Sequence, residues 1–276
     1  MGLDRCEVFV EGLDHPEGVC IDAAGTLYAG GEAGQVYRID VDKREPVEVA
    51  NTGGFLLGLC ADGAGRLYAC DVARAEVLRV DPRDGTVEVY SNGMPDRPMV
   101  NPNWGVFDAA AVLYVTDSGH WKQNDGWIWR IEPDGSTTVW TEQSRGFPNG
   151  ACLTADGSAL LVLESTTPAL VRIPINPDGS AGARTVVASL PKPSVPDGVT
   201  VDADGNAYVC YYRPDRIDRV SPDGSIITIA DDPEGTMLSA PTNAVWWNGD
   251  LITGNLGRWH LTLVRLGAQG VPLRYP

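Results

Sequence analysis

Three short stretches of the chain place an oxygen-bearing side chain between a proline and a glycine. They are HPEGV at 15–19, FPNGA at 147–151 and VPDGV at 195–199, and their central residues are Glu17, Asn149 and Asp197. Carboxylate and amide oxygens are the ligands that hard divalent cations such as Ca²⁺ take in proteins. If the fold brings these side chains together, they can hold one cation, which could then polarise a bound carbonyl group.

The spacing of these stretches indicates an internal repeat. Alignment on the residue after the proline extends the series to six positions, here called the marker residues, with separations of 40, 46, 46, 48 and 45 residues. One stretch, FLLGLC, lacks the proline but keeps the glycine. The marker residues are Glu17, Leu57, Asn103, Asn149, Asp197 and Thr242. A repeat of this length is typical of the blades of a β-propeller.

Each repeat also contains further short β-rich runs separated by DG or DxxG turns. Examples from the first repeat are TLYAG, QVYRID and PVEVA. The sixth repeat stops after its third run, at LTLVRLGAQG, whereas CEVFVEG at 6–12 has the pattern of a missing fourth strand. We therefore expect an all-β chain that forms one domain over 1–276. It is a six-bladed β-propeller with four antiparallel strands per blade, and its ring is closed by the N-terminal strand.

The marker residues are expected to begin the innermost strands, so their side chains should converge at one mouth of the central channel. Converging carboxylates repel one another unless a cation lies between them. Oxygen donors without His or Cys favour Ca²⁺, with Zn²⁺, Mn²⁺ or Mg²⁺ as alternatives. The predicted metal ligands are Glu17, Asn103, Asn149 and Asp197. Four protein ligands leave coordination positions for water and substrate.

Other residues are expected near the same mouth, because the loop between the second and third strands of a blade returns to the marker side. The longest of these loops, DSGHWKQNDG at 117–126, could act as a lid. The candidate substrate-binding residues are Asn103, Trp104, His120, Trp121, Tyr211 and Trp259. For each aromatic residue the alternative is packing between blades, and for His120 it is simple exposure.

Composition limits the possible partners. The chain has 276 residues, 43% of them hydrophobic, and a net charge of -16, which argues against nucleic-acid binding. No apolar run approaches the length of a membrane span, and no secretory leader is recognisable. The six cysteines form no CxxC pair and read as buried packing residues of a reduced, cytoplasmic protein. We expect a small-molecule substrate and neither a nucleic-acid nor a membrane partner, while the oligomeric state stays open.

Taken together, HPEGV, NPNW, FPNGA and VPDGV resemble the SMP-30/gluconolactonase/luciferin-regenerating-enzyme family of six-bladed propellers over nearly the whole chain. The resemblance implies a divalent metal held by Glu17, Asn149 and Asp197, with Asn103 at the metal or in contact with substrate. It also implies hydrolysis of a lactone or related ester. Sugar-lactone members tend to read RPND in the third blade. Here Trp104 replaces the acid and Asn101 lies near the place of the arginine, which favours a flatter or more apolar substrate.

The leading hypothesis is a metal-dependent lactonase in which the ion polarises the carbonyl group and Asp197 activates water. Three alternatives remain open. The same ring could serve an esterase or phosphotriesterase, or a non-hydrolytic biosynthetic enzyme that binds an enolate or carbonyl. A binding scaffold of the WD-repeat type is the third, although the repeated WD dipeptide is absent.

Overall fold

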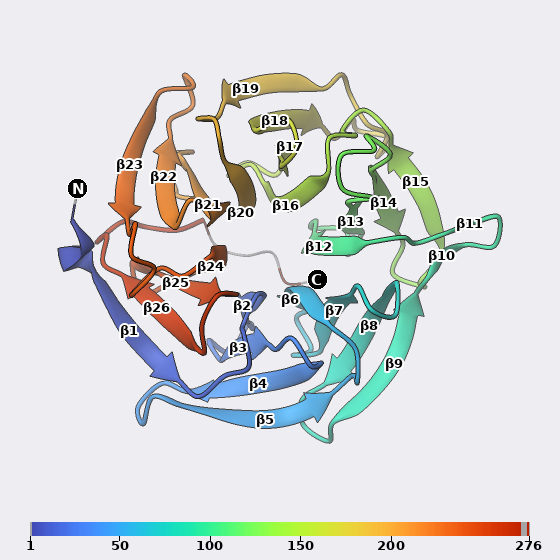
Figure 1. The fold of residues 1–276 in the computed structure, drawn as a ribbon. Helices are drawn as coiled ribbons and strands as arrows, with labels where there is room; N and C mark the ends of the chain where they lie inside the picture. Colours follow the sequence, from blue (N-terminus) through green and yellow to red (C-terminus); the bar gives the residue numbers. More distant parts are fainter. Residues whose placement is uncertain (1, 272–274, 276) are drawn as a thin grey trace.

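Six four-stranded antiparallel sheets surround a central axis (Figure 1). The structure, a computed structural model, describes residues 2–271 and residue 275. The predicted domain also includes residues 1, 272–274 and 276, which lie outside the described residues. Apart from the 3-10 helix η1 (Leu3–Arg5), the elements of the described chain are strands. The predicted six-bladed, all-β propeller with four strands per blade is therefore confirmed.

In the first five blades the strands follow chain order from the axis outward. The first blade contains β2 (Val19–Ile21), β3 (Leu27–Gly30), β4 (Gln35–Asp40) and β5 (Glu45–Asn51). The second contains β6 (Leu56–Ala61), β7 (Leu67–Asp71), β8 (Glu76–Asp81) and β9 (Thr86–Ser91). The third contains β12 (Pro102–Phe107), β13 (Leu113–Asp117), β14 (Trp127–Ile131) and β15 (Thr137–Thr141). The fourth contains β16 (Pro148–Leu153), β17 (Ala159–Glu164), β18 (Ala169–Pro174) and β19 (Thr185–Ser189). The fifth contains β20 (Val195–Val201), β21 (Ala207–Arg213), β22 (Arg216–Val220) and β23 (Ile226–Asp231).

The sixth blade combines the two ends of the chain. Its inner strands are β24 (Pro241–Trp247), β25 (Asp250–Asn255) and β26 (His260–Val264), and its outer strand is β1 (Cys6–Glu11). Strand β1 pairs antiparallel with β26, with Cys6 opposite Val264 and Glu11 opposite His260. Closure by the N-terminal strand is thus confirmed, and it removes the unpaired edge that β26 would otherwise present.

One hairpin was not predicted. It is formed by β10 (Gly93–Met94) and β11 (Arg97–Pro98) and extends beyond the outer rim between the second and third blades (Figure 1). The Arg97 guanidinium stacks over the Trp127 ring at 4.2 Å and pairs with Glu142, which ties the hairpin to the third blade.

Turns between the first and second strands repeat one device in four blades. In the second blade Asp62 Oδ1 accepts hydrogen bonds from the backbone N–H groups of Ala64 and Arg66, both at 2.9 Å. Its other oxygen accepts from the Tyr68 hydroxyl at 3.2 Å. The equivalent pairs are Asp22–Tyr28, Asp108–Tyr114 and Asp202–Tyr208. Three of these turns read D-x-x-G, and in the third blade Ala111 takes the place of the glycine with a φ of 64°. In all four the aspartate caps its own turn and anchors it to the second strand.

Apolar clusters fill the spaces between neighbouring blades. Between the sixth and first blades, Phe9 and Leu261 pack with Leu27 and Ile39. Fully burying one such side chain contributes about 1.5–3 kcal/mol, so each blade depends on its neighbours. All six cysteines are free, and four of them (Cys6, Cys20, Cys70 and Cys210) are buried, as expected for packing residues.

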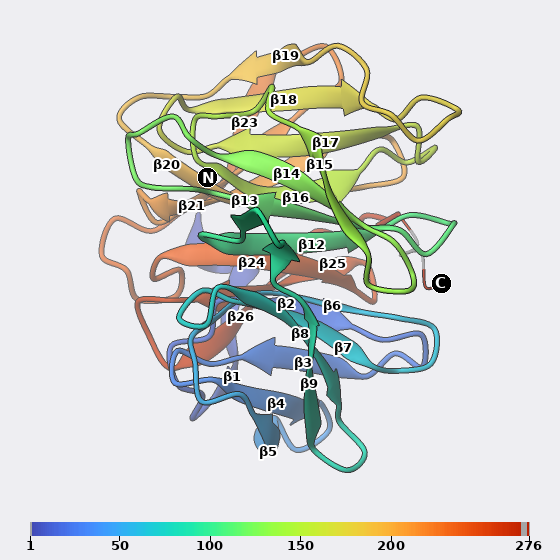
Figure 2. The ribbon, with the colours of Figure 1, turned by 90° about the vertical axis from the view of Figure 1, so that its right-hand side faces the viewer.

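The innermost strands run along the channel axis, as the side view shows (Figure 2). Successive positions on these strands therefore lie at successive depths in the channel. Side chains at equivalent positions of different blades therefore lie at the same depth, where they can contact one another.

Candidate functional site

A pocket of about 310 Å³ opens at one mouth of the channel, around the marker residues. Glu17, Asn103, Asn149 and Asp197 all line it, although they come from the first, third, fourth and fifth blades. Each of these side chains is at most 6% exposed. The four predicted metal ligands therefore share one buried pocket.

The two remaining marker residues supply no ionic oxygen. Leu57 lines the same pocket as part of its apolar wall. The Thr242 hydroxyl instead donates a hydrogen bond to the Glu17 backbone carbonyl oxygen at 3.0 Å, which fastens the sixth blade to the first.

Glycines after the marker residues allow the inner strands to approach closely. A Cβ added to Gly18 would lie 2.3 Å from the Leu57 carbonyl oxygen, and one on Gly150 would lie 2.4 Å from that of Asp197. Each glycine therefore faces the marker of the next blade, and a side chain there would push the two strands apart. The glycine of the repeated motif has a packing role that brings the marker residues together.

A buried aspartate holds the segment that leads to Asn103. Asp117, at the end of β13, accepts hydrogen bonds from the backbone N–H groups of Val100 (2.9 Å) and Asn101 (2.8 Å). It also accepts from Trp129 Nε1 at 3.0 Å. These contacts fix where the chain enters β12 and hence where Asn103 points.

Three ligand candidates carry an oxygen without a partner. Within the described chain, Asn103 Oδ1, Asn149 Oδ1 and Asp197 Oδ1 are buried and accept no hydrogen bond. The Asn149 amide nitrogen donates to Ser165 Oγ at 3.2 Å, which leaves its oxygen for the pocket. An unsatisfied buried polar group costs about 1–3 kcal/mol. A cation coordinated by all three oxygens would remove this cost, so the residues fit a hard divalent cation such as Ca²⁺.

The two carboxylates show the same need for positive charge. Burial raises the pKa of Asp197 to about 8. Burial also raises the pKa of Glu17 well above its usual value, and the negative charges of Asp197 and Glu32 raise it further. The pocket therefore opposes ionisation of both acids unless a cation compensates.

The rest of the pocket is apolar or aromatic. The rings of Trp121 and Phe147 meet edge to face, with centroids 4.9 Å apart. Asn101 is a further polar group, and its Oδ1 is also buried without a partner while its amide nitrogen donates to the Gly119 carbonyl oxygen at 3.3 Å. The apolar wall consists of Phe55, Leu57, Trp121, Phe147, Val195, Tyr212 and Leu256.

The structure separates the predicted substrate-binding residues. Asn103 and Trp121 line the mouth pocket. Trp104 lines a second cavity of about 110 Å³, farther along the inner strands. It is the direct neighbour of Asn103 on β12, and adjacent residues of a strand point in different directions. Tyr211 is fully buried among core residues of the fifth blade. A substrate role for Trp104 or Tyr211 stays a prediction without a place in the mouth pocket.

The other two predicted residues lie on loops at the rim. His120 is exposed, and its Nδ1 lies 2.7 Å from Asp125 Oδ2 within the 117–126 loop. Trp259 is 56% exposed, and its ring centroid lies 5.4 Å from that of His15. Neither is among the residues that line the mouth pocket, and their roles also stay predictions.

Several pocket residues were not predicted. Phe55, Asn101, Phe147 and Val195 all lie two positions before a marker residue. The repeat alignment therefore contained the signal for these four. Tyr212 lies where the chain passes from the second to the third strand of the fifth blade, a segment expected at the mouth, but only the strand register distinguishes it from its equally aromatic neighbour Tyr211.

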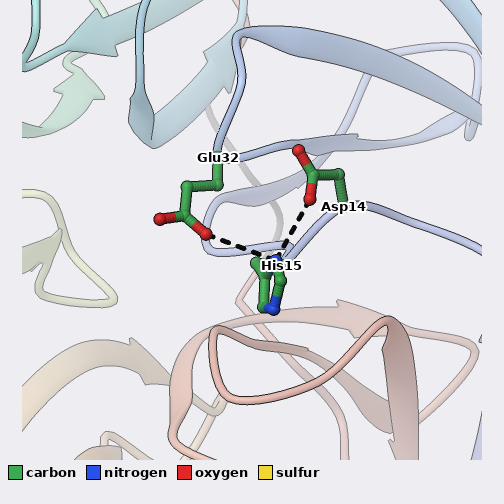
Figure 3. A group of neighbouring side chains, drawn as sticks. All are labelled: Asp14, His15 and Glu32. Atoms are coloured by element: carbon green, nitrogen blue, oxygen red, sulfur yellow. Dashed lines mark hydrogen bonds and ion pairs between the residues drawn. The ribbon is translucent and has the colours of Figure 1, made fainter.

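A polar cluster also lies at the rim beside the first blade (Figure 3). His15 Nδ1 lies 3.1 Å from Asp14 Oδ1 and 3.2 Å from Glu32 Oε2. One ligand atom from each residue falls within 4.8 Å of the others, a spacing that a metal ion could use. All three side chains are partly exposed and already pair with one another, so they read as a surface ion-pair network.

Comparison with known proteins agrees with this geometry. A family model described as SMP-30/Gluconolactonase/LRE-like region matches residues 16–244. The chain belongs to this family. The matched region contains all six marker residues.

Curated relatives carry the name lactonase drp35. The protein of Staphylococcus haemolyticus is 27% identical over 218 residues, covering 74% of this chain and 66% of the relative. That of Staphylococcus epidermidis is 33% identical over 116 residues, covering 41% of this chain and 36% of the relative. The matches thus span two thirds or less of the length of these relatives.

Solved structures show the same fold. A gluconolactonase of Xanthomonas campestris superposes with a TM-score of 0.80 at 19% identity, covering 95% of this chain and 89% of the other. A luciferin-regenerating enzyme gives a TM-score of 0.79 at 15% identity and covers 98% of both chains. Regucalcin of Agrobacterium tumefaciens, described as a calcium-binding protein, gives 0.78 at 17%, covering 98% of this chain and 97% of its own. Within the described chain, no helix has the length and apolar character needed to cross a membrane.

Proposed function

We propose that the protein is a divalent-cation-dependent hydrolase that opens a lactone or a related cyclic ester. The observation that carries the proposal is the set of unpaired, buried oxygens from Asn103, Asn149 and Asp197 beside the carboxylate of Glu17. The names of the relatives, lactonase and gluconolactonase, support the reaction class. The calcium-binding regucalcin supports Ca²⁺ as the ion, although its likeness at 17% identity concerns the fold.

Four side chains would hold the cation: Glu17, Asn103, Asn149 and Asp197. When bound, the cation supplies Lewis-acid polarisation of the carbonyl group and compensation of the charge that develops on its oxygen. Glu17 and Asn149 serve mainly as ligands, and Asn103 also orients water or substrate.

Asp197 is the proposed general base. Its carboxylate takes a proton from the attacking water as the new carbon–oxygen bond forms, and the proton then passes to the ring oxygen as the ester bond breaks. The product is an open-chain hydroxy acid. Asp197 would divide its two carboxylate oxygens between the two roles: the unpaired Oδ1 would be the cation ligand, and the other oxygen would take the proton.

The proposal includes the setting of the reaction. The whole chain is taken to act as one domain on a small molecule, with no nucleic-acid partner. Six free cysteines support a reducing compartment such as the cytoplasm.

The test is an assay of lactone hydrolysis with and without chelator. We expect purified protein to release acid from lactones in a pH-stat, to lose activity with EDTA, and to regain it with Ca²⁺. Incorporation of one oxygen from ¹⁸O-labelled water into the product distinguishes hydrolysis from isomerisation or elimination. Activity that is indifferent to exhaustive chelation, or a product without ¹⁸O, would contradict the proposal. A parallel panel of linear esters and phosphotriesters tests the alternative substrates of the same site.

A further inference from the structure

Two tiers of side chains line the mouth of the channel at fixed positions in the repeat. The marker tier holds the oxygens, and the tier two positions earlier, nearer the mouth, includes Phe55, Asn101, Phe147 and Val195. Any substrate whose ester group reaches the marker tier must therefore place the rest of its body against this outer tier. The outer tier thus decides which substrates fit.

The walls that meet the substrate body are almost entirely apolar. Trp121 and Leu256 from loops, and Tyr212 from the end of β21, add to the outer tier. Among the described residues that line the pocket, none is a lysine or arginine, and besides the four marker side chains the main polar groups are the Asn101 amide and the Tyr212 hydroxyl. A charged or many-hydroxyl substrate body would have few partners there.

The aromatic groups are also arranged for a flat ring. Trp121 and Phe147 already form an edge-to-face pair at 4.9 Å, a geometry that a third ring can extend. A pocket of about 310 Å³ falls at the small end of ligand sites, large enough for a bicyclic body but not for an extended chain.

We infer that the substrate is an uncharged lactone whose body is a flat, apolar or aromatic ring, rather than a polyhydroxylated sugar lactone. The inference rests on the proposed function for the ester group and extends it to the substrate body. The physical reason is desolvation: an apolar ring gains from contact with Trp121 and Phe147, whereas sugar hydroxyls buried there would lose water without a replacement partner.

The sequence-based expectation of an apolar substrate rested on Trp104. The structure places Trp104 in the deeper cavity, so that argument does not apply to the mouth pocket. The same conclusion now follows from different residues.

The first experiment compares three δ-lactones: an unsubstituted ring, a benzo-fused ring and glucono-δ-lactone. Each kcat/KM is divided by the rate constant of the lactone's own hydroxide-catalysed hydrolysis, which removes differences in intrinsic reactivity. We expect the benzo-fused lactone to exceed glucono-δ-lactone by at least about tenfold, with the unsubstituted ring between them. Equal or better turnover of glucono-δ-lactone would overturn the inference and leave the proposed function standing.

Unreactive analogues separate binding of the body from turnover. The δ-lactams that correspond to the benzo-fused lactone and to gluconolactone are titrated by calorimetry in the presence of Ca²⁺. Tighter binding of the benzo-fused lactam supports the inference even if no lactone is hydrolysed, in which case only the proposed function fails. Equal or tighter binding of the sugar lactam overturns it.

Two substitutions in the apolar wall of the pocket test whether this wall causes the preference for an apolar substrate. Phe147 has a φ of 60°, a conformation that Asn tolerates well, so Phe147→Asn makes the wall polar with little backbone strain. Trp121→Ser lies on an exposed loop and provides a second variant should the first not fold. Either should raise KM for the benzo-fused lactone about tenfold while changing that for the unsubstituted ring by less than threefold.

Val186→Ser, on the outer strand of the same blade as Phe147, is the matched control because Val186 is 52% exposed and far along the sheet from the axis. An unchanged KM in both wall variants, or the same change in the control, overturns the inference.

Discussion

The marker tier and the tier three positions farther along the same strands have opposite chemistry. The first presents carboxylate and amide oxygens, three of them without hydrogen-bond partners. The second lines the cavity of about 110 Å³ with three thiols, two valines and one threonine: Cys20, Cys60, Val106, Cys152, Thr200 and Val245. Both tiers are formed by the same six strands around the same axis.

This difference shows that the propeller fold brings side chains from six blades together at each depth of the channel. The residue types at that depth then determine which chemistry is possible. In the deeper tier, burial raises the pKa of the thiols, for example that of Cys152 to about 12, and neutral thiols pack without needing a counter-ion. In the marker tier, burial raises the pKa of Asp197 to about 8 and leaves a group that a cation can satisfy. Residue type at each offset decides which tier can act on a substrate.

The largest expected effect comes from changing one residue of each tier on strand β20. Asp197→Asn should retain the fold, shown by circular dichroism, and lower kcat for lactone hydrolysis by about 10²–10⁴-fold, because the variant lacks the proposed general base. Thr200→Val, in the deeper tier, should change kcat less than twofold. Full activity in the first variant, or a comparable loss in the second, would erase the distinction between the tiers.

On the first blade, the affinity for Ca²⁺ can be measured after a substitution in each of the two tiers. Glu17→Gln removes one negative charge from the marker tier and should weaken Ca²⁺ binding at least about tenfold, equivalent to about 1.4 kcal/mol, as measured by calorimetry. Cys20→Ala, three residues later in β2, should leave the dissociation constant unchanged. A shift of similar size in both variants would mean that the change is transmitted by the fold rather than by a ligand.

The pH dependence of stability tests the charges of the marker tier. In chelated protein the folded state keeps the Asp197 proton up to about pH 8, whereas the unfolded chain releases it near pH 3.8. Stability should therefore fall as pH rises across this window, by up to about 1.4 kcal/mol per pH unit for one proton. Ca²⁺ at a hundred times its dissociation constant should restore about 2.7 kcal/mol at neutral pH. Urea midpoints measured from pH 4 to 8 check both; a flat profile without Ca²⁺ would count against a buried acid pair.

The close spacing between neighbouring inner strands depends on Gly150. Gly150→Ala places a methyl group against the Asp197 carbonyl oxygen and should cost about 1–3 kcal/mol in urea unfolding. Gly105→Ala is the control, because its nearest neighbour would be the Leu113 side chain at 3.2 Å, which can move. Equal costs would show that the close approach at the marker tier is not what the glycine provides.

Most of the fold could be predicted because the strand pattern repeats six times. The predicted run PVEVA at 46–50, for instance, lies within β5 (Glu45–Asn51) and is one residue shorter at each end. The β10–β11 hairpin could not be predicted, because two-residue strands carry no alternation.

The sequence could predict only those site residues that occupy equivalent positions in the repeats. Glu17, Asn149 and Asp197 share one offset and one pocket, and Phe147 was available from the same alignment. Trp104 and Tyr211 depended on local register. Strand β12 shifts register at Trp104, and β20 shifts twice opposite the end of β21, so side-chain direction there does not follow from spacing. Bulges of this kind are set by contacts between strands that the sequence pattern does not display.

Anomalous diffraction from crystals grown with excess Ca²⁺ tests the central claim most directly. The account predicts one strong peak on the channel axis, with oxygens of Glu17, Asn103, Asn149 and Asp197 at about 2.3–2.6 Å. No peak at the marker residues, or a peak confined to the Asp14–His15–Glu32 cluster at the rim, would contradict it.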